Sequence, residues 1–105
     1  MEQPNLNYIN ELSGDNHEFK TKLIGILKKE LPAEIIAYSE EMASNSFSDA
    51  AQSVHKLKHK ISILGLEKSY YIAEQYEDNL ITGTTILKFE FETVLKSMQD
   101  FVYYL

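Results

Sequence analysis

The chain of 105 residues contains no cysteine, no tryptophan and no arginine. Without cysteine it forms no disulfide, uses no thiol in catalysis and binds no zinc through sulfur. Its longest apolar runs, residues 63–66 and 101–105, are far shorter than the roughly 18 residues of a membrane-spanning helix. Ten lysines stand against sixteen acidic residues, for a net charge of −6. Because the apolar runs are short, we expect no membrane partner. We also expect no nucleic-acid partner, because binding the phosphate backbone of a nucleic acid requires a net positive surface.

The first residues, MEQPNLNYINE, lack the basic stretch and apolar run of a secretory signal. Together with the missing cysteines, this predicts a cytoplasmic protein. The length predicts a single domain over residues 1–105. The initial Met favours a separate protein over a domain of a larger sensor, and we expect a monomer.

Apolar residues recur at spacings of three and four, and only four glycines and two prolines interrupt them. Helices are expected over residues 5–12, 15–42, 46–64, 66–80 and 84–105. Long helices joined by short loops lie antiparallel to bury their apolar faces. The predicted fold class is therefore all-α, an up-down antiparallel four-helix bundle with a short N-terminal extra helix.

Local signals set the expected helix ends. Ser13 and Gly14 stop the first helix, and Asp15 with Glu18 predicts a capping box at the start of the second. Pro32 lies inside the second helix, where we expect a kink rather than a break. The residues expected on the buried faces are Phe19, Leu23, Ile26, Leu27, Leu31, Ile35, Tyr38, Met42, Ala50, Val54, Leu57, Ile61, Leu64, Leu66, Tyr70, Ala73, Tyr76, Leu80, Leu87, Phe91, Val94, Met98, Phe101 and Leu105.

The stretch VHKLKHKISILG, residues 54–65, has an unusual charge. Residues 50–66 contain three lysines, two histidines and no acid, whereas the rest of the chain has seven lysines against sixteen acids. A local positive patch on an acidic protein favours an encounter with an acidic or phosphorylated group.

His55 is the candidate reactive residue in this stretch. At about 100° per residue, it lies roughly 140° from the centre of the apolar stripe between Leu57 and Ile61, so it points into solvent. Lys58 and His59 follow one helical turn later. A neutral imidazole is a nucleophile near neutral pH, and the lysine would offset the charge of a phosphoryl group on the ring.

These residues resemble the core motif of the histidine-containing phosphotransfer (HPt) domain, which is His, any residue, Leu, Lys, usually Gly, and a second Gly ten places after the His. The matching residues are His55, Leu57, Lys58 and Gly65. The run Asn7–Leu12, Gly14-Asp15, Phe19 and Glu30-Leu31-Pro32 also resembles the family's opening helix, turn and long second helix. The similarity covers most of the chain through about Leu80. It departs from the family at His59, which stands where a Gly is common.

The resemblance implies a phosphorelay carrier of two-component signal transduction, with His55 as phosphoacceptor and Lys58 as the residue that stabilises the phosphate. The carrier takes a phosphoryl group from the aspartate of a response-regulator receiver domain and passes it to another receiver. It is a stoichiometric intermediate, not an enzyme, and has no autokinase activity. The implied partners are receiver domains and a hybrid sensor histidine kinase. No cofactor is expected on this chain, and Mg²⁺ is expected on the receiver.

The other candidate phosphate- or partner-binding residues are His59, Gln52, Ser62 and Lys56. His59 either narrows access to His55 or donates a hydrogen bond to the phosphate. Gln52 and Ser62 bond either the phosphate or only water. Lys56 is either solvated or attracts the acidic surface of a receiver. Lys58 could equally lie along the bundle surface.

Two alternatives remain open. The first is a non-catalytic helical adaptor that binds a receiver without accepting phosphate. The second is a bundle that binds a metal through His55 and His59, for which zinc would need a third protein ligand. We expect His17 to be an ordinary surface residue, and the pairs Glu40-Glu41 and Glu77-Asp78 to be solvated.

Overall fold

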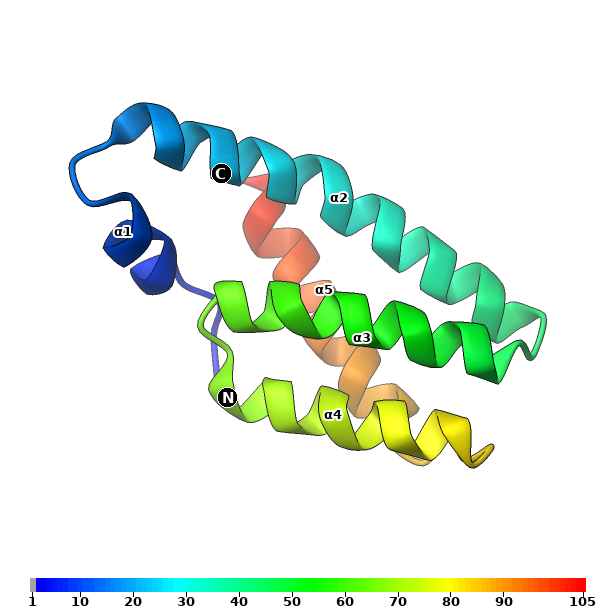
Figure 1. Cartoon of the computed structure of the whole chain (residues 1–105). Coiled ribbons are helices and arrows are strands. Elements are labelled where there is room, and N and C mark those ends of the chain that lie inside the picture. Colours follow the sequence, from blue (N-terminus) through cyan, green and yellow to red (C-terminus); the bar gives the residue numbers. More distant parts are fainter. Residues whose placement is uncertain (1) are drawn as a thin grey trace.

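The computed structural model describes residues 2–105, and over this range it consists of α-helices without any strand. The helices are α1 (Asn7–Ser13), α2 (His17–Ala43), α3 (Phe47–Ile63), α4 (Glu67–Ile81) and α5 (Lys88–Tyr103). Each long helix packs against the next, and α5 returns to α2, while α1 packs against α2 (Figure 1). The all-α fold with a short N-terminal helix is confirmed. No helix within residues 2–105 has both the length and the apolar character needed to cross a membrane.

The start of α2 differs from the prediction by one residue. The side chain of Asn16, not Asp15, accepts a hydrogen bond from the backbone N–H of Phe19 at 3.0 Å. The predicted Asp15–Glu18 capping box is therefore wrong, because asparagine caps a helix as well as aspartate does and lies one residue later. The helix then continues through Pro32 without a break.

The start of α5 is also later than expected, at Lys88 rather than Thr84 or Thr85. The hydroxyl of Thr84 accepts a hydrogen bond from the N–H of Ile86 at 3.4 Å, and the Thr85 carbonyl accepts one from Lys88 at 3.0 Å. Threonine and isoleucine favour helices weakly, and a hydroxyl that bonds nearby backbone groups favours a turn. These residues therefore form a tight connection instead of a first helical turn.

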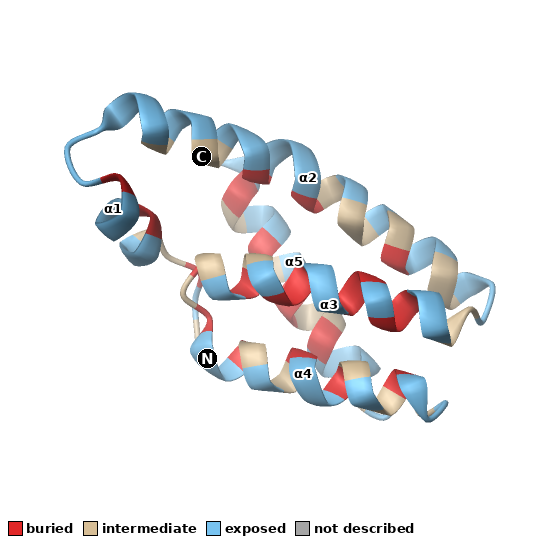
Figure 2. Ribbon diagram, in the orientation of Figure 1, coloured by how far each residue is buried: buried red, intermediate tan, exposed pale blue. Residues whose placement is uncertain are grey.

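Most buried residues lie on the predicted stripes of the helices (Figure 2), and Ile9, Ala51, Leu95 and Val102 are buried in addition to them. Two predicted core residues are exceptions, since Phe19 and Ile26 are 42% and 44% exposed. The reason is length, because α2 has 27 residues and α3 has 17. The first turns of α2 extend past the end of α3 (Figure 1), and a stripe there has fewer neighbours to cover it.

A polar cluster lies within the core between α2, α4 and α5. The hydroxyl of Tyr38 donates to the carboxylate of Glu92 at 2.8 Å and lies 2.7 Å from the hydroxyl of Tyr76. Because Tyr38 has a single proton to donate, Tyr76 donates to Tyr38. Burial raises the pKa of both phenols, so both stay neutral. The cluster links three helices through hydrogen bonds that are satisfied inside the protein.

The N-terminal segment holds the turn between α3 and α4. The backbone N–H of Asn5 donates to the carbonyl of Leu64 at 2.9 Å. Gly65 has a φ of +75°, and a Cβ there would lie 2.7 Å from the Asn5 amide. The Glu2 carboxylate accepts hydrogen bonds from the N–H groups of Lys68 and Ser69 at 2.9 and 3.0 Å. These contacts tie the N-terminal segment to the turn of the α3–α4 hairpin that carries the candidate site.

Candidate functional site

His55 lies in the middle of α3, and its side chain is 54% exposed. The prediction that it points into solvent is confirmed. The apolar residues around it in sequence, Val54 and Leu57, are fully buried, as are Ala50 and Ile61. Burial of these apolar residues sets the orientation of α3, so the ring of His55 points outward from a helix and not from a loop.

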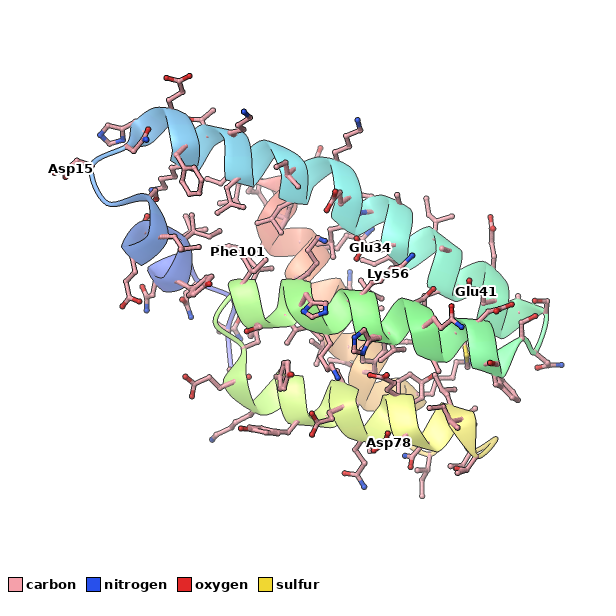
Figure 3. All side chains as sticks on the ribbon, viewed as in Figure 1. Asp15, Glu34, Glu41, Lys56, Asp78 and Phe101 are labelled. Atoms are coloured by element: carbon pink, nitrogen blue, oxygen red, sulfur yellow. The ribbon has the colours of Figure 1, made fainter. Side chains whose placement is uncertain are left out.

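The carboxylate of Glu77, from α4, binds both His55 and Lys58. Its Oε2 lies 3.1 Å from Nδ1 of His55, and its Oε1 accepts a hydrogen bond from Nζ of Lys58 at 3.1 Å. Glu77 is only 19% exposed. The expectation that Glu77 is merely solvated is therefore wrong, whereas its neighbour Asp78 is exposed as expected (Figure 3). Glu77 is the site residue that the sequence reasoning missed.

The contact with Glu77 determines which ring nitrogen of His55 is free. An ionised carboxylate only accepts hydrogen bonds, so Nδ1 of His55 carries the proton and donates it. In the neutral form of the ring, Nε2 then keeps its lone pair. This nitrogen is the nucleophilic atom of a neutral imidazole that is more than half exposed and held in a fixed orientation by Glu77.

Lys58 is less available than expected. Its side chain is 10% exposed and lies over the ring of Tyr70, with Nζ 5.6 Å from the ring centroid. Burial alone would lower the pKa of Lys58, but the hydrogen bond to Glu77 and its negative charge outweigh this and raise that pKa. Lys58 is thus charged but nearly buried between α3 and α4. Its charge is already balanced by Glu77 in the absence of a phosphoryl group.

A hollow of about 400 Å³ lies beside His55, between α3 and α4. We call it the α3–α4 hollow. It is lined by Ser48, Ala51, Gln52, His55, Lys56, Glu77 and Ile81. The structure therefore brings Gln52 and Lys56, two of the predicted partner-binding residues, to the same surface as His55.

His59 and Ser62 face a different hollow. The rings of His55 and His59 meet edge to face, with centroids 5.2 Å apart and planes at 88°. His59 and Ser62 also line a second hollow of about 500 Å³ with Glu67, Tyr70 and Tyr71. Of these two predicted residues, His59 therefore touches His55, whereas Ser62 lies in the neighbouring hollow and not in that of His55.

The expected positive patch is largely neutralised. Lys58 is paired with Glu77, and Nζ of Lys60 lies 3.0 Å from carboxylate oxygens of Glu30 and Glu34 on α2. Burial would lower the pKa of Lys60, but these two acids raise it. Within residues 2–105, Lys56 is the one lysine of α3 without an ion pair. Acids far away in sequence thus cancel most of the charge that looked unbalanced along the chain.

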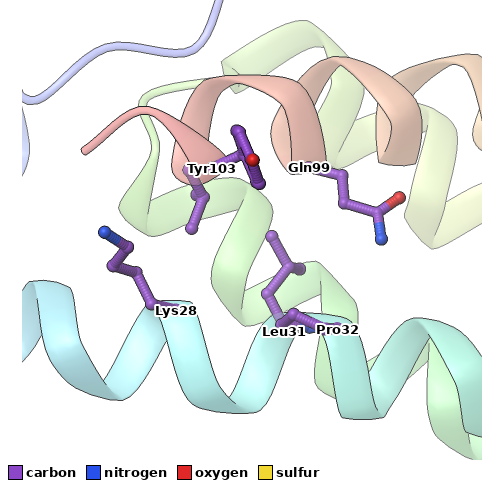
Figure 4. A pocket seen from close by; sticks show the side chains of 6 residues that line it. Lys28, Leu31, Pro32, Gln99 and Tyr103 are labelled. Atoms are coloured by element: carbon purple, nitrogen blue, oxygen red, sulfur yellow. The ribbon is translucent and has the colours of Figure 1, made fainter.

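Other features of residues 2–105 contribute no chemistry to this site. No group of three His, Cys, Asp or Glu side chains in this range is arranged to hold a metal ion, so His55 and His59 have no third ligand. A pocket of about 530 Å³ lies between α2 and α5 (Figure 4), lined by Lys28, Leu31, Pro32, Gln99, Val102 and Tyr103. It contains no histidine and no residue of α3. His17 is exposed, as expected.

The fold and the site together define a helical bundle that presents one histidine, held by a carboxylate, on the outside of its third helix. Comparison with protein-family models finds none that matches this chain, and comparisons with curated proteins and with solved structures find no match. A functional assignment therefore depends on the geometry described above and on the residues that resemble the HPt motif.

Proposed function

We propose that this chain is an HPt-type phosphorelay carrier in which Nε2 of His55 accepts a phosphoryl group from the aspartate of a receiver domain and passes it to another receiver. The observation that carries the proposal is the bond between Nδ1 of His55 and Glu77 on a ring whose side chain is 54% exposed. It gives this histidine what an ordinary surface histidine lacks, a fixed tautomer and a fixed direction.

The chemistry of the step fits these groups. The lone pair of Nε2 attacks phosphorus, a P–N bond forms, and the P–O bond to the partner's aspartate breaks with its electron pair leaving on the aspartate oxygen. The ring keeps its Nδ1 proton and becomes an imidazolium. Oε2 of Glu77 lies 3.1 Å from Nδ1, the nitrogen that carries this proton, and its negative charge stabilises the new positive charge. The reverse step, onto a second receiver, uses the same groups.

In the proposed reaction, this chain supplies mainly the position of the accepting imidazole and hydrogen-bond donors beside it. Phosphoryl transfer requires alignment and neutralisation of charge on the phosphoryl oxygens. Mg²⁺ and the aspartate belong to the proposed receiver partner. On this chain, the ring N–H of His59 and the amide of Gln52 are donors close to His55. Lys58 acts mainly through Glu77, whose charge it balances.

A transfer assay tests the proposal. Receiver domains from the source organism, phosphorylated with acetyl phosphate in the presence of Mg²⁺, are mixed with the chain, and phosphate on the chain is tested for acid lability and base stability. We expect label on the wild type and on His17→Gln, a matched exposed histidine, and none on His55→Gln. Label that persists in His55→Gln would remove His55 from the mechanism.

A receiver-binding adaptor that accepts no phosphate is the second candidate. The observation that favours it is that Lys58, the residue to which the resemblance assigns the phosphate, is already bound to Glu77. An adaptor would bind one receiver tightly and gain no label from any. Titration calorimetry run beside the transfer assay separates the two functions.

A further inference from the structure

We propose, on the basis of the carrier function above, that the partner domain reaches His55 across the α3–α4 hollow and covers the last turn of α4, leaving α2 uncovered. The apolar part of this contact would be the Ile81 corner, which we define as Ile81, Ile86 and Phe89. The inference concerns the direction of approach, and it follows from what surrounds the His55 ring on each side.

The side toward α2 is closed by polar contacts within the protein. Lys60 of α3 is bound to Glu30 and Glu34 of α2, and its side chain is only 12% exposed. Two residues before His55, the hydroxyl of Ser53 donates to the carboxylate of Glu41 on α2 at 2.5 Å. A partner that docked here would have to separate charged groups that already satisfy each other, which is costly.

The side toward the C-terminal end of α3 is occupied by His59. Its ring stands at 88° to that of His55, with the centroids 5.2 Å apart. A side chain at this position narrows the approach along α3 from that end. The remaining open side leads toward Ser48 and Gln52 on α3 and, because the helices are antiparallel, toward the last turn of α4.

This open side ends in exposed apolar residues. Ile81 lines the same hollow as His55 and is 67% exposed. The connection that follows folds back on α4, because the N–H of Thr84 donates to the carbonyl of Asn79 at 2.9 Å. It carries Ile86, and the first turn of α5 carries Phe89; these are 77% and 79% exposed. The three exposed apolar side chains thus lie within nine residues of one another along the chain, at the α4–α5 connection. Exposed apolar side chains that occur together mark an interaction site more often than scattered ones do.

The kind of partner that would bind here follows from the residues that His55 shares the α3–α4 hollow with. A domain that occupies the α3–α4 hollow contacts both His55 and Ile81, because the two residues line that one hollow. Lys56, at the edge of the hollow, is the lysine of α3 that keeps an unbalanced charge. The partner that fits is therefore a folded phosphodonor domain with an apolar surface and an acidic residue beside it, placed opposite Lys56.

Aspartate substitutions at matched exposed positions test the direction of approach. Ile81→Asp places a charge on the proposed path, whereas Ile36→Asp places the same charge on α2, where Ile36 is 58% exposed. With the receiver that labels the wild type, we expect Ile81→Asp to slow transfer at least tenfold and Ile36→Asp to change it less than twofold. Ile86→Asp and Phe89→Asp should weaken receiver binding measurably.

A small phosphodonor separates docking from chemistry. Phosphoramidate transfers its phosphoryl group to imidazole with release of ammonia and needs no docking surface. We expect it to label Ile81→Asp and the wild type at equal rates. Slower receiver transfer in Ile36→Asp, with no change in Ile81→Asp, would overturn the proposed direction while the carrier function stands. If no receiver labels the wild type, the carrier function itself fails.

Discussion

Two polar clusters join neighbouring helices of this bundle, and they differ in their access to water. Inside, Tyr76 donates to Tyr38, which donates to Glu92. Outside, His55 donates to Glu77. Each ends on one carboxylate, but the inner cluster has no free reactive atom, whereas the outer one leaves a ring nitrogen open. The same kind of hydrogen bond therefore joins buried helices in one place and, under the proposed function, would orient a nucleophile in the other, and the difference between them is exposure to solvent.

The largest effect should come from the apolar stripe that holds the outer cluster in place. Leu57 is fully buried, and Leu57→Ala should destabilise the fold by about 2–5 kcal/mol through lost burial and a cavity. His55→Ala should change stability by less than about 0.5 kcal/mol, because the ring is exposed. Urea unfolding of both variants measures this. A large loss for His55→Ala would contradict the separation of structure from chemistry on α3.

The inner cluster should show an intermediate effect. Tyr38→Phe removes the hydroxyl that bonds both Tyr76 and Glu92, which takes a donor from Glu92 and leaves Tyr76 only the sulfur of Met42, at 3.8 Å, as an acceptor. We expect a loss of about 1–3 kcal/mol in unfolding free energy. Tyr71→Phe is the matched control, since Tyr71 is 68% exposed and should change stability by less than about 0.5 kcal/mol. Equal effects of the two variants would mean that the inner cluster contributes nothing to packing.

The fold was largely predictable because apolar spacing along one helix records which face that helix buries. The stripe of Val54, Leu57 and Ile61 and the exposure of His55 both follow from one angle per residue. Helix ends were less predictable. At the start of α2, Asn16 rather than its neighbour Asp15 caps the helix. Before α5, the Thr84 hydroxyl bonds the backbone N–H of Ile86, and a turn forms instead of a helix. A single side chain thus determines where each helix begins.

The candidate site was only half predictable, because periodicity says nothing about contacts between helices. Glu77 is the clearest case. His55 lies eleven residues before Leu66, at the turn, and Glu77 lies eleven residues after it. At about 1.5 Å per residue, an antiparallel hairpin places both about 16 Å from the turn and therefore side by side. That spacing was a usable signal, whereas the pairing of Lys60 with α2 had no comparable one.

Removing the acceptor of the outer cluster should affect chemistry more than folding. A glutamine at position 77 offers both a donor and an acceptor to Nδ1 of His55, so the proton is no longer confined to that nitrogen. For Glu77→Gln we expect phosphotransfer to slow about tenfold. Nitrogen NMR of His55 should show a mixture of tautomers. Asp78→Asn, the exposed neighbour, should change neither. A single unchanged tautomer in Glu77→Gln would contradict the role given to this carboxylate.

The smallest effect should come from a third carboxylate, Glu2, which accepts hydrogen bonds from two backbone N–H groups at the start of α4 and, at 3.1 Å, from the hydroxyl of Ser69. Burial opposes its ionisation, but the hydrogen bonds from Lys68 and Ser69 outweigh this and lower the pKa of Glu2 from 4.5. A carboxyl whose pKa is lower in the folded state than in the unfolded state stabilises the fold at pH values above the unfolded pKa. That stabilisation is lost as the pH falls through the folded pKa.

Glu2→Gln should therefore cost less than about 1 kcal/mol near pH 7, because the carboxylate is only partly buried and solvent screens its interactions. The gap between this variant and the wild type should narrow as the pH falls below about 4.5. Urea unfolding between pH 3 and 7 measures it, with Glu11→Gln, an exposed acid of α1, as control. A difference in unfolding free energy that stays constant with pH would show that the hydrogen bonds between Glu2 and α4 do not depend on the charge of Glu2. In that case Glu2 would differ from Glu77, whose contact with His55 is expected to depend on its charge.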